Sequence, residues 1–309
     1  MVFTTGTCSA VPRPFAPTYP VFPRTEIPLS TLAVRARPRF TTGPLPILAA
    51  CLLWGTTGTA SSFAPASAPA AAVGAAGLVL GGLLLFLTAR GARSVLRTAD
   101  RRLLLLGAVT VAGYVLAFYP AVERTGVAVA TTVALATAPI VLGVRTRPLL
   151  TSTAVAGCAA LVLGGGGAHV DLVGVALALV AGLSYAAYSV VCAHLIGLGH
   201  PSRAVVGTVF GGASLLTAPL LWWLGTGWLA TPAGLGVTAH LALFTTFLAY
   251  LLFGLGLRHT SAATATTLTL AEPAVAAVLG VVVLHERLPL ASWCGLAVLT
   301  LALTALTRP

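Results

Sequence analysis

The strongest constraint on this chain is a succession of long apolar segments that begins at Pro44 and continues almost to the C-terminus. Each segment is about 17–25 residues long, the length of helix that crosses about 30 Å of hydrocarbon. The segments are continuous rather than alternating, which favours helices over the strands of a membrane barrel. We predict an all-α, polytopic membrane protein with ten transmembrane helices, at residues 44–63, 69–89, 103–120, 125–144, 149–167, 172–193, 204–224, 235–257, 261–284 and 290–307.

The composition excludes most other classes of protein. Hydrophobic residues make up 58% of the chain and charged residues only 7%, whereas a soluble domain carries about 25% charged residues. A soluble enzyme, a secreted disulfide scaffold and a disordered protein are therefore excluded. The cysteines form no pairs or clusters, and no histidine is spaced with carboxylates as a metal ligand would be, so we expect no metal site and no cofactor.

The arginines indicate an orientation in the membrane. All 17 basic residues are arginine, and they lie mainly in the short gaps between apolar segments. This distribution is typical of cytoplasmic loops that face anionic lipid, and it argues against nucleic-acid binding. If the N-terminus is inside, only Arg124 and Arg287 fall on the outer side. We therefore expect a cytoplasmic-membrane protein with both termini in the cytoplasm.

The chain divides into an arm and two similar halves. Residues 1–43 are rich in proline and arginine and are expected to form a disordered N-terminal arm. Two five-helix repeats are predicted to follow, at 44–168 and 169–309. The matching positions, which keep their order along the chain, are Trp54 with Tyr185, Thr110 and Tyr114 with Thr246 and Tyr250, Thr131–Thr132 with Thr266–Thr267, Pro139 with Pro273, and Gly157 with Gly295. Since five spans is an odd number, the repeats have inverted topology, which suits alternating access.

Several motifs carry a resemblance to a known family. They are Leu52 to Gly55, Ala134 to Pro139, Leu270 to Gly280, His285 to Leu288, and Gly295. With these motifs, residues 44–307 resemble the EamA-type ten-helix transporters of the drug/metabolite transporter superfamily. The resemblance implies a secondary transporter and a Glu-Pro pair in the ninth helix. The first copy departs from this pattern, because Pro139 has no preceding glutamate.

Glu272 is the only ionisable residue near the middle of a predicted span. A carboxyl group there normally faces a cavity or a partner, and away from water it can exchange a proton near neutral pH. Glu272 is thus the candidate for coupling proton entry to substrate exit. The alternative is structural: the side chain would bond to backbone freed by Pro273. Pro139 and Pro273 are both predicted to break their helices.

Aromatic and hydroxyl side chains near mid-span are the candidates for a substrate cavity. Aromatic rings beside a few hydroxyl groups suit an amphipathic organic substrate. The alternative is that the aromatic residues pack between helices or lie at the membrane interface. The candidates are Trp54, Thr57, Thr110, Tyr114, Tyr185, Tyr188, Thr246, Tyr250, Thr269 and Glu272.

The function expected from these features is secondary transport without a catalytic site. The chain is predicted to export a small metabolite, amino acid or drug-like compound, by proton coupling or exchange, and to work as a monomer whose partners are its substrate and the lipid bilayer. An intramembrane enzyme is one alternative, although Gly182-Leu183-Ser184-Tyr185 lacks a rhomboid-type Gly-x-Ser-Gly motif. A flippase for lipids or lipid-linked sugars is the other alternative.

Overall fold

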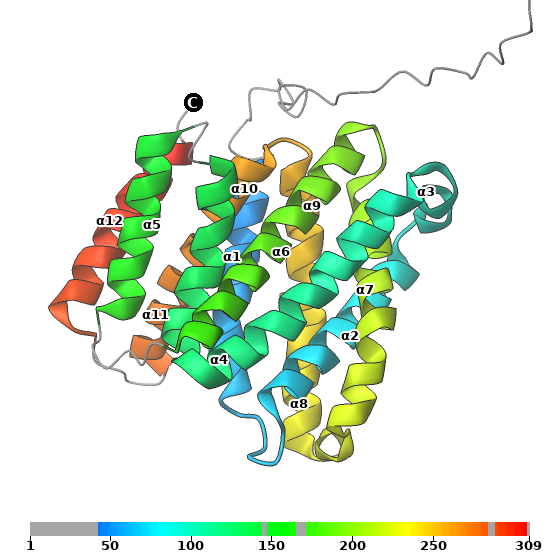
Figure 1. Cartoon of the computed structure of the whole chain (residues 1–309), viewed down its shortest axis with the longest axis horizontal. Coiled ribbons are helices and arrows are strands. Elements are labelled where there is room, and N and C mark those ends of the chain that lie inside the picture. The colour runs from blue at the N-terminus through cyan, green and yellow to red at the C-terminus, as the bar shows by residue number, and fades with distance from the viewer. Residues whose placement is uncertain (1–42, 144–146, 165–170, 284–287, 308–309) are drawn as a thin grey trace, which may run out of the picture. The chain divides into compact units, whose positions relative to one another are not determined.

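The computed structural model describes residues 43–143, 147–164, 171–283 and 288–307. All regular structure in these ranges is helical (Figure 1), which confirms the predicted all-α class for the part of the chain described. The predicted N-terminal arm lies outside the described residues, apart from Gly43.

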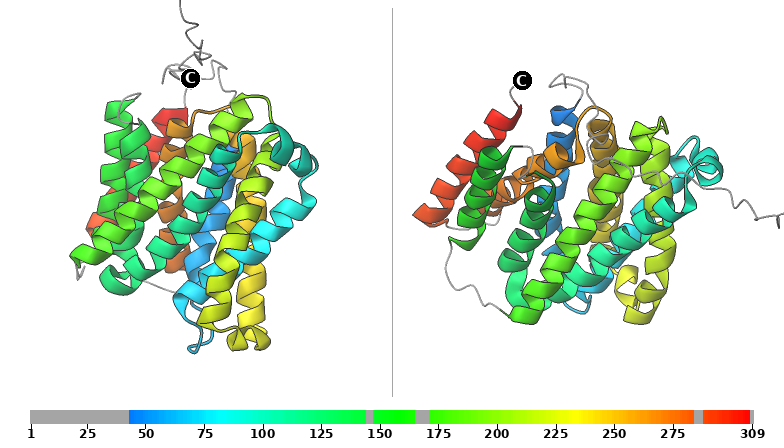
Figure 2. Two further views of the ribbon diagram at one scale, coloured as in Figure 1. Left: turned by 45° about the vertical axis from the view of Figure 1, so that its right-hand side comes forward. Right: turned by 45° about the horizontal axis from the view of Figure 1, so that its top comes forward.

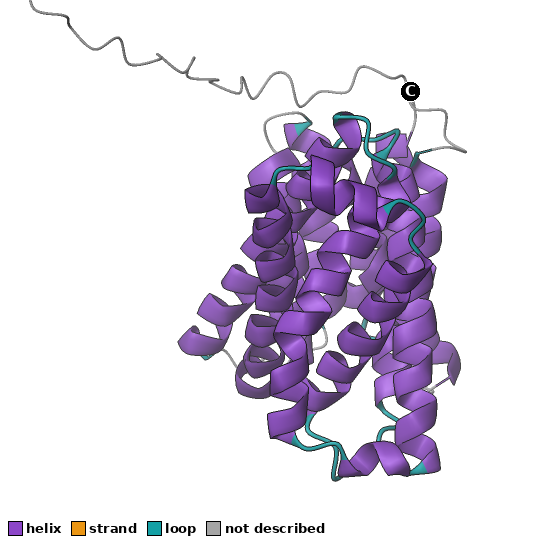
Figure 3. Ribbon diagram, turned by 90° about the vertical axis from the view of Figure 1, so that its right-hand side faces the viewer, coloured by secondary structure: helices purple, strands orange, loops and turns teal. Residues whose placement is uncertain are grey.

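The helices follow the predicted apolar segments closely. In chain order they are α1 (Pro44–Ser61), α2 (Ala70–Thr88), α3 (Ala92–Thr98), α4 (Arg101–Gly143), α5 (Pro148–Leu163), α6 (Leu172–Gly197), α7 (Ser202–Leu224), η2 (Gly227–Ala230), α8 (Pro232–His240), η3 (Leu241–Leu248), α9 (Ala249–Leu257), α10 (Ala262–Leu268), α11 (Ala271–Val283) and α12 (Leu290–Thr307). The loops between them gather at two ends of the helices (Figure 3).

Six helices in the described part of the chain are long and apolar enough to cross a membrane, namely Ala70–Thr88, Arg101–Gly126, Leu172–Gly197, Ser202–Leu224, Pro232–Leu257 and Ala262–Val283. Shorter apolar helices cover Val129–Gly143, Pro148–Leu163 and Leu290–Leu306. Large apolar side chains lie exposed on the helices, among them Trp222 at 82% and Leu87 at 77%. Such a surface suits contact with lipid rather than water. The count of ten spans stays a prediction.

Two boundaries differ from those expected. The third predicted helix was to end at residue 120, but helical structure continues past Pro120 to Gly126, where φ is 80°. Glycine adopts this left-handed conformation without a steric penalty, so it is Gly126 that divides α4. The short helix α3 was expected to be a loop. It forms because Ala92, Val95 and Ala99 lie on one face and are buried, with α7 as a packing partner.

Glycines allow close contacts between the halves of the chain. α5 and α12 lie side by side in all views (Figures 1 and 2). A Cβ atom at Gly157 would come within 2.6 Å of the backbone nitrogen of Leu299, and one at Gly295 would meet that of Leu161. The two contacts are reciprocal, since each glycine meets the residue four positions after the other.

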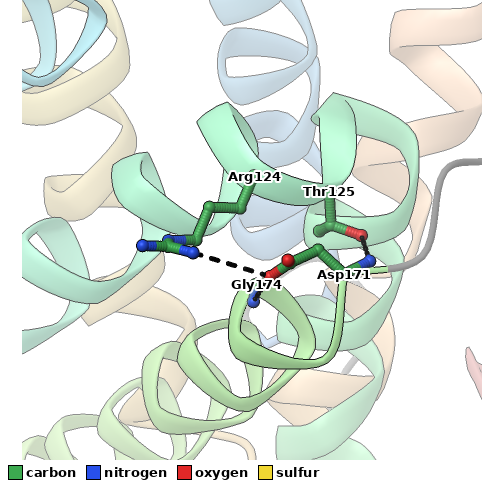
Figure 4. A network of polar contacts seen from close by, with 4 residues as sticks. All are labelled: Arg124, Thr125, Asp171 and Gly174. Carbon is green, nitrogen blue, oxygen red and sulfur yellow. Dashed lines mark hydrogen bonds and ion pairs between the residues drawn. The ribbon is translucent and has the colours of Figure 1, made fainter.

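Asp171 joins the start of α6 to the middle of α4 (Figure 4). Its carboxylate accepts a hydrogen bond of 2.7 Å from the backbone N–H of Gly174, which caps the helix. Its own N–H donates to the Thr125 hydroxyl at 3.4 Å, and its carboxylate lies 3.9 Å from the Arg124 guanidinium. The ion pair is largely exposed, so the helix cap is the stronger contribution.

Candidate functional site

The second half of the chain contains a helix break immediately before Pro273. α10 ends at Leu268, Thr269 and Leu270 form a turn, and α11 begins at Ala271. Because Pro273 has no N–H, it cannot donate to the carbonyl of Thr269. That carbonyl accepts instead from the N–H of Glu272 at 3.0 Å. The chain therefore turns more tightly here than in an α-helix.

Neighbouring groups satisfy the carbonyls that the break would leave free. In a continuous helix the Leu268 carbonyl would accept from the N–H of Glu272, but here it accepts from the Cys51 thiol of α1 at 3.6 Å. The carbonyl of Thr266 accepts from the Thr269 hydroxyl at 2.8 Å. The break thus depends on a side chain from the other half of the molecule.

Tyr185 of α6 holds the same turn. Its hydroxyl lies 2.6 Å from that of Thr269, and both side chains are buried. With the Thr269 hydrogen on the carbonyl of Thr266, Tyr185 is the donor in this bond. Two of the predicted site residues, Tyr185 and Thr269, are therefore hydrogen-bonded to each other.

Glu272 lies in the first turn of α11, where the positive end of the helix dipole favours a carboxylate. Its side chain is partly buried. Within the described ranges its carboxyl has no hydrogen-bond or ion-pair partner. Two contacts place other residues at the same turn: Tyr185 bonds to Thr269, three residues before Glu272, and Cys51 bonds to Leu268, four residues before it.

An aromatic cluster joins α1, α6, α7 and α9 beside this break. The Tyr250 ring lies 5.0 Å from Trp54 and 4.1 Å from Phe210, between ring centroids. The Tyr188 and Tyr250 hydroxyls are 3.2 Å apart. Phe253 also contacts Trp54, at 5.7 Å. Trp54, Tyr188 and Tyr250 were predicted site residues, whereas the two phenylalanines were missed because nothing distinguishes them from the other apolar residues of their helices.

A π-helical segment changes the geometry next to Tyr250. η3 covers Leu241–Leu248, and the Trp54 indole N–H donates to the Thr245 carbonyl in it at 2.8 Å. Segments of this kind are rare and frequently occur at functional sites. Within this segment Thr246 lies against Gly81 of α2, while Tyr250, two residues after the segment, contacts Trp54.

The remaining candidates make more local contacts. The Thr110 hydroxyl donates to the Leu106 carbonyl of its own helix at 2.7 Å. Tyr114 stacks on Phe118 with ring centroids 5.4 Å apart. Thr57 is partly buried on α1. The helix containing Pro139 continues through that residue to Gly143, in contrast to the break at Pro273.

These observations define a class of protein: a polytopic helical membrane protein with a carboxyl group and an aromatic cluster beside a helix break. The sequence matches the EamA-like transporter family over residues 41–164 and 172–308. The chain therefore belongs to this family, as its motifs indicated, and it is a multi-pass membrane transporter rather than an enzyme.

One individual protein supports this assignment, and one solved structure shares the fold. The chain is 37% identical over 273 residues to a Bacillus subtilis (strain 168) protein called "Uncharacterized transporter YwfM", covering 84% of this chain and 92% of that protein. It also aligns with a crystal structure of another protein at a TM-score of 0.71 and 21% identity, covering 85% of this chain and 96% of the other. At that identity the structure shows the shared fold alone.

Proposed function

We propose that this transporter is a secondary exporter of a small metabolite, amino acid or drug-like compound across the cytoplasmic membrane. In this proposal two inverted five-helix repeats, at 44–168 and 169–309, alternate access to a site between them. Both termini face the cytoplasm, as the arginine distribution indicates. The transporting unit in this proposal is the monomer.

Two observations favour the repeat. The family match consists of two ranges, 41–164 and 172–308, which correspond closely to the proposed halves. Gly157 and Gly295, which are matched in sequence, also make reciprocal contacts. Reciprocal contact between matched residues is the pattern expected across a twofold axis. An axis in the membrane plane relates the two halves of an inverted-repeat transporter.

The observation that supports proton coupling is that the Glu272 carboxyl does not bond to the backbone at the helix break. If its role were structural, its carboxyl would bond to the backbone freed by Pro273. That backbone is instead satisfied by Cys51, the Thr269 hydroxyl and the N–H of Glu272. The carboxyl therefore remains available to bind a proton or a substrate group.

The surrounding residues favour an amphipathic substrate. Rings from Trp54, Tyr188 and Tyr250 offer apolar and edge contacts, and the tyrosine hydroxyls offer a few orienting hydrogen bonds. In this conformation the rings pack against one another. Substrate passage would then require that α1 separate from α9, which breaks the Trp54–Tyr250 contact.

The test is transport by inside-out membrane vesicles with a panel of amino acids and metabolites, with and without a proton gradient. Glu272→Gln keeps the shape of the side chain but cannot ionise, so we expect loss of gradient-driven uptake into these vesicles. Glu123→Gln is the matched control, because Glu123 is exposed near the end of its helix. Wild-type transport by Glu272→Gln at every pH would contradict coupling.

A further inference from the structure

A cavity separate from the candidate site lies between α1, α8 and α11. Its volume is about 470 Å³, within the range of about 300–1,000 Å³ that is usual for small-molecule sites. Its walls include Ala60, Phe63, Ala233 and Leu279. None of the ten predicted site residues lines it. Its walls come from the part of α1 that follows Trp54 and from the helix that precedes η3.

The cavity lies toward one end of the helices. α1 reaches it near its Ser61 end, and α8 begins beside it; both lie toward the lower end in Figure 1. With the N-terminus of α1 on the cytoplasmic side, this end faces the outside. A compound that leaves the aromatic cluster toward the outside would therefore pass the cavity.

The polar contacts of the cavity involve Thr56 and His240. The Thr56 hydroxyl oxygen lies 2.6 Å from the Leu53 carbonyl and 2.8 Å from His240 Nε2. With the hydroxyl hydrogen on the Leu53 carbonyl, Nε2 is the donor to Thr56. In a neutral imidazole, Nδ1 is then an acceptor. Within the described ranges it has no hydrogen-bond partner.

We infer that this cavity is a second binding site, for a small solute with a flat apolar body and one hydrogen-bond donor. The apolar walls, which include the Phe63 ring, accept the body, and Nδ1 of His240 accepts the donor. The cavity lining contains no Arg, Asp or Glu. The site therefore offers no fixed charge to a carboxylate or a phosphate.

Gly236 provides a way to block the cavity without disturbing the fold. It lines the cavity, and a Cβ atom added there would meet no atom within 4 Å. Gly236→Leu therefore places a side chain where space exists. Gly58 is also helical and also has open space around an added Cβ, but it does not line the cavity. Gly58→Leu is thus the matched control.

The experiment measures protection of Ala60→Cys from a maleimide, using the full chain in phosphatidylcholine nanodiscs. Cys8 and the exposed Cys294 are replaced by serine, while the described remaining cysteines are buried. The probes are indole and 1-methylindole, which have the same ring system but differ in the N–H donor. We expect indole to protect, and 1-methylindole to need an about five-fold higher concentration, as for one lost hydrogen bond.

The variants distinguish binding in this cavity from an effect of the probes on the bilayer. Gly236→Leu is expected to abolish protection by indole and Gly58→Leu to retain it, while His240→Leu should make the two probes equal. Equal protection by both probes that survives Gly236→Leu would mean that they act through the bilayer and would overturn the inference. Absence of protection, as from a lipid chain that fills the cavity, would also overturn it. This experiment measures binding and not transport. The second site can therefore be refuted while Glu272-dependent export is still observed.

Discussion

The fourth and ninth predicted helices contain matching motifs, but their structures differ. In each, a Thr-Thr pair is followed by a proline, Pro139 in the first half and Pro273 in the second. The helix around Pro139 is continuous to Gly143, whereas the chain around Pro273 is interrupted between Leu268 and Ala271. A proline alone therefore does not produce the break.

The helices packed against the two segments account for the difference. In the proposed repeat, the offset of Trp54 and Tyr185 pairs Cys51 of α1 with Gly182 of α6, and the offset of Pro139 and Pro273 pairs Ala134 with Leu268. The Cys51 thiol donates to the Leu268 carbonyl at the break, whereas a Cβ at Gly182 would come within 2.6 Å of the Ala134 carbonyl. The continuous helix around Pro139 thus packs closely against Gly182. The broken helix around Pro273 receives a hydrogen bond from the Cys51 side chain.

The largest loss of stability is expected at the contact between α5 and α12, to which each half contributes one glycine. Gly295→Leu would force a side chain into the backbone of α5 at Leu161, where no flexible group can yield. We expect destabilisation by about 3 kcal/mol or more, which is the upper range for overpacking. Gly157→Leu should have a similar effect, because the contact is reciprocal. Thermal unfolding in detergent, with Gly58→Leu as control, measures it; a stable Gly295→Leu would refute the twofold packing.

A smaller loss of stability is expected at Gly182, where the two halves have different residues. Gly182→Cys gives α6 the residue that α1 has at the matching position, but its Cβ would approach both Thr137 and the Ala134 carbonyl. We expect destabilisation by about 2 kcal/mol, because the helix there is continuous and has no free carbonyl to accept a thiol hydrogen. The measurement is again thermal unfolding. An unchanged melting temperature would show that this part of α4 can yield as the broken helix does.

Tyr185→Phe removes one hydrogen bond from the break and leaves the ring packing intact. We expect a loss of about 1 kcal/mol, since the Thr269 hydroxyl keeps its bond to the Thr266 carbonyl. Tyr114→Phe is the control, because the described part of the chain offers the Tyr114 hydroxyl no hydrogen-bond partner. Equal effects of the two variants on unfolding would mean that the Tyr185–Thr269 bond does not hold the turn.

The sequence predicted those features that depend on local pattern. Apolar length located the helices, and the Glu-Pro pair located the region of the break. The π-helical turn of η3 was not predictable, because the residues of Leu241–Leu248 carry no local signal for it. The division of α4 was predicted a few residues before Gly126, in the charged gap that contains Glu123 and Arg124.

Tertiary contacts account for the rest of the site. Phe210 enters the aromatic cluster because α7 packs beside α9, and no spacing within α7 shows this. In the sequence, Cys51 has only the features of a small apolar residue, which fit its burial but do not indicate its bond to Leu268. A single thiol acquires this role only when a carbonyl of another helix is left free. The packing partner, not the cysteine itself, determines it.

A last prediction, with an effect no larger than that of Tyr185→Phe, tests that bond directly. Cys51→Ala removes the thiol donor from the Leu268 carbonyl, and a thiol is a weak donor at 3.6 Å. We expect a loss of about 1 kcal/mol in stability, composed of the unsatisfied carbonyl and a small cavity. Cys51→Ser keeps a donor in the same place and should recover part of this loss. If serine destabilises the protein more than alanine does, the thiol acts only by filling space, and the break must be held from α6 by Tyr185 alone.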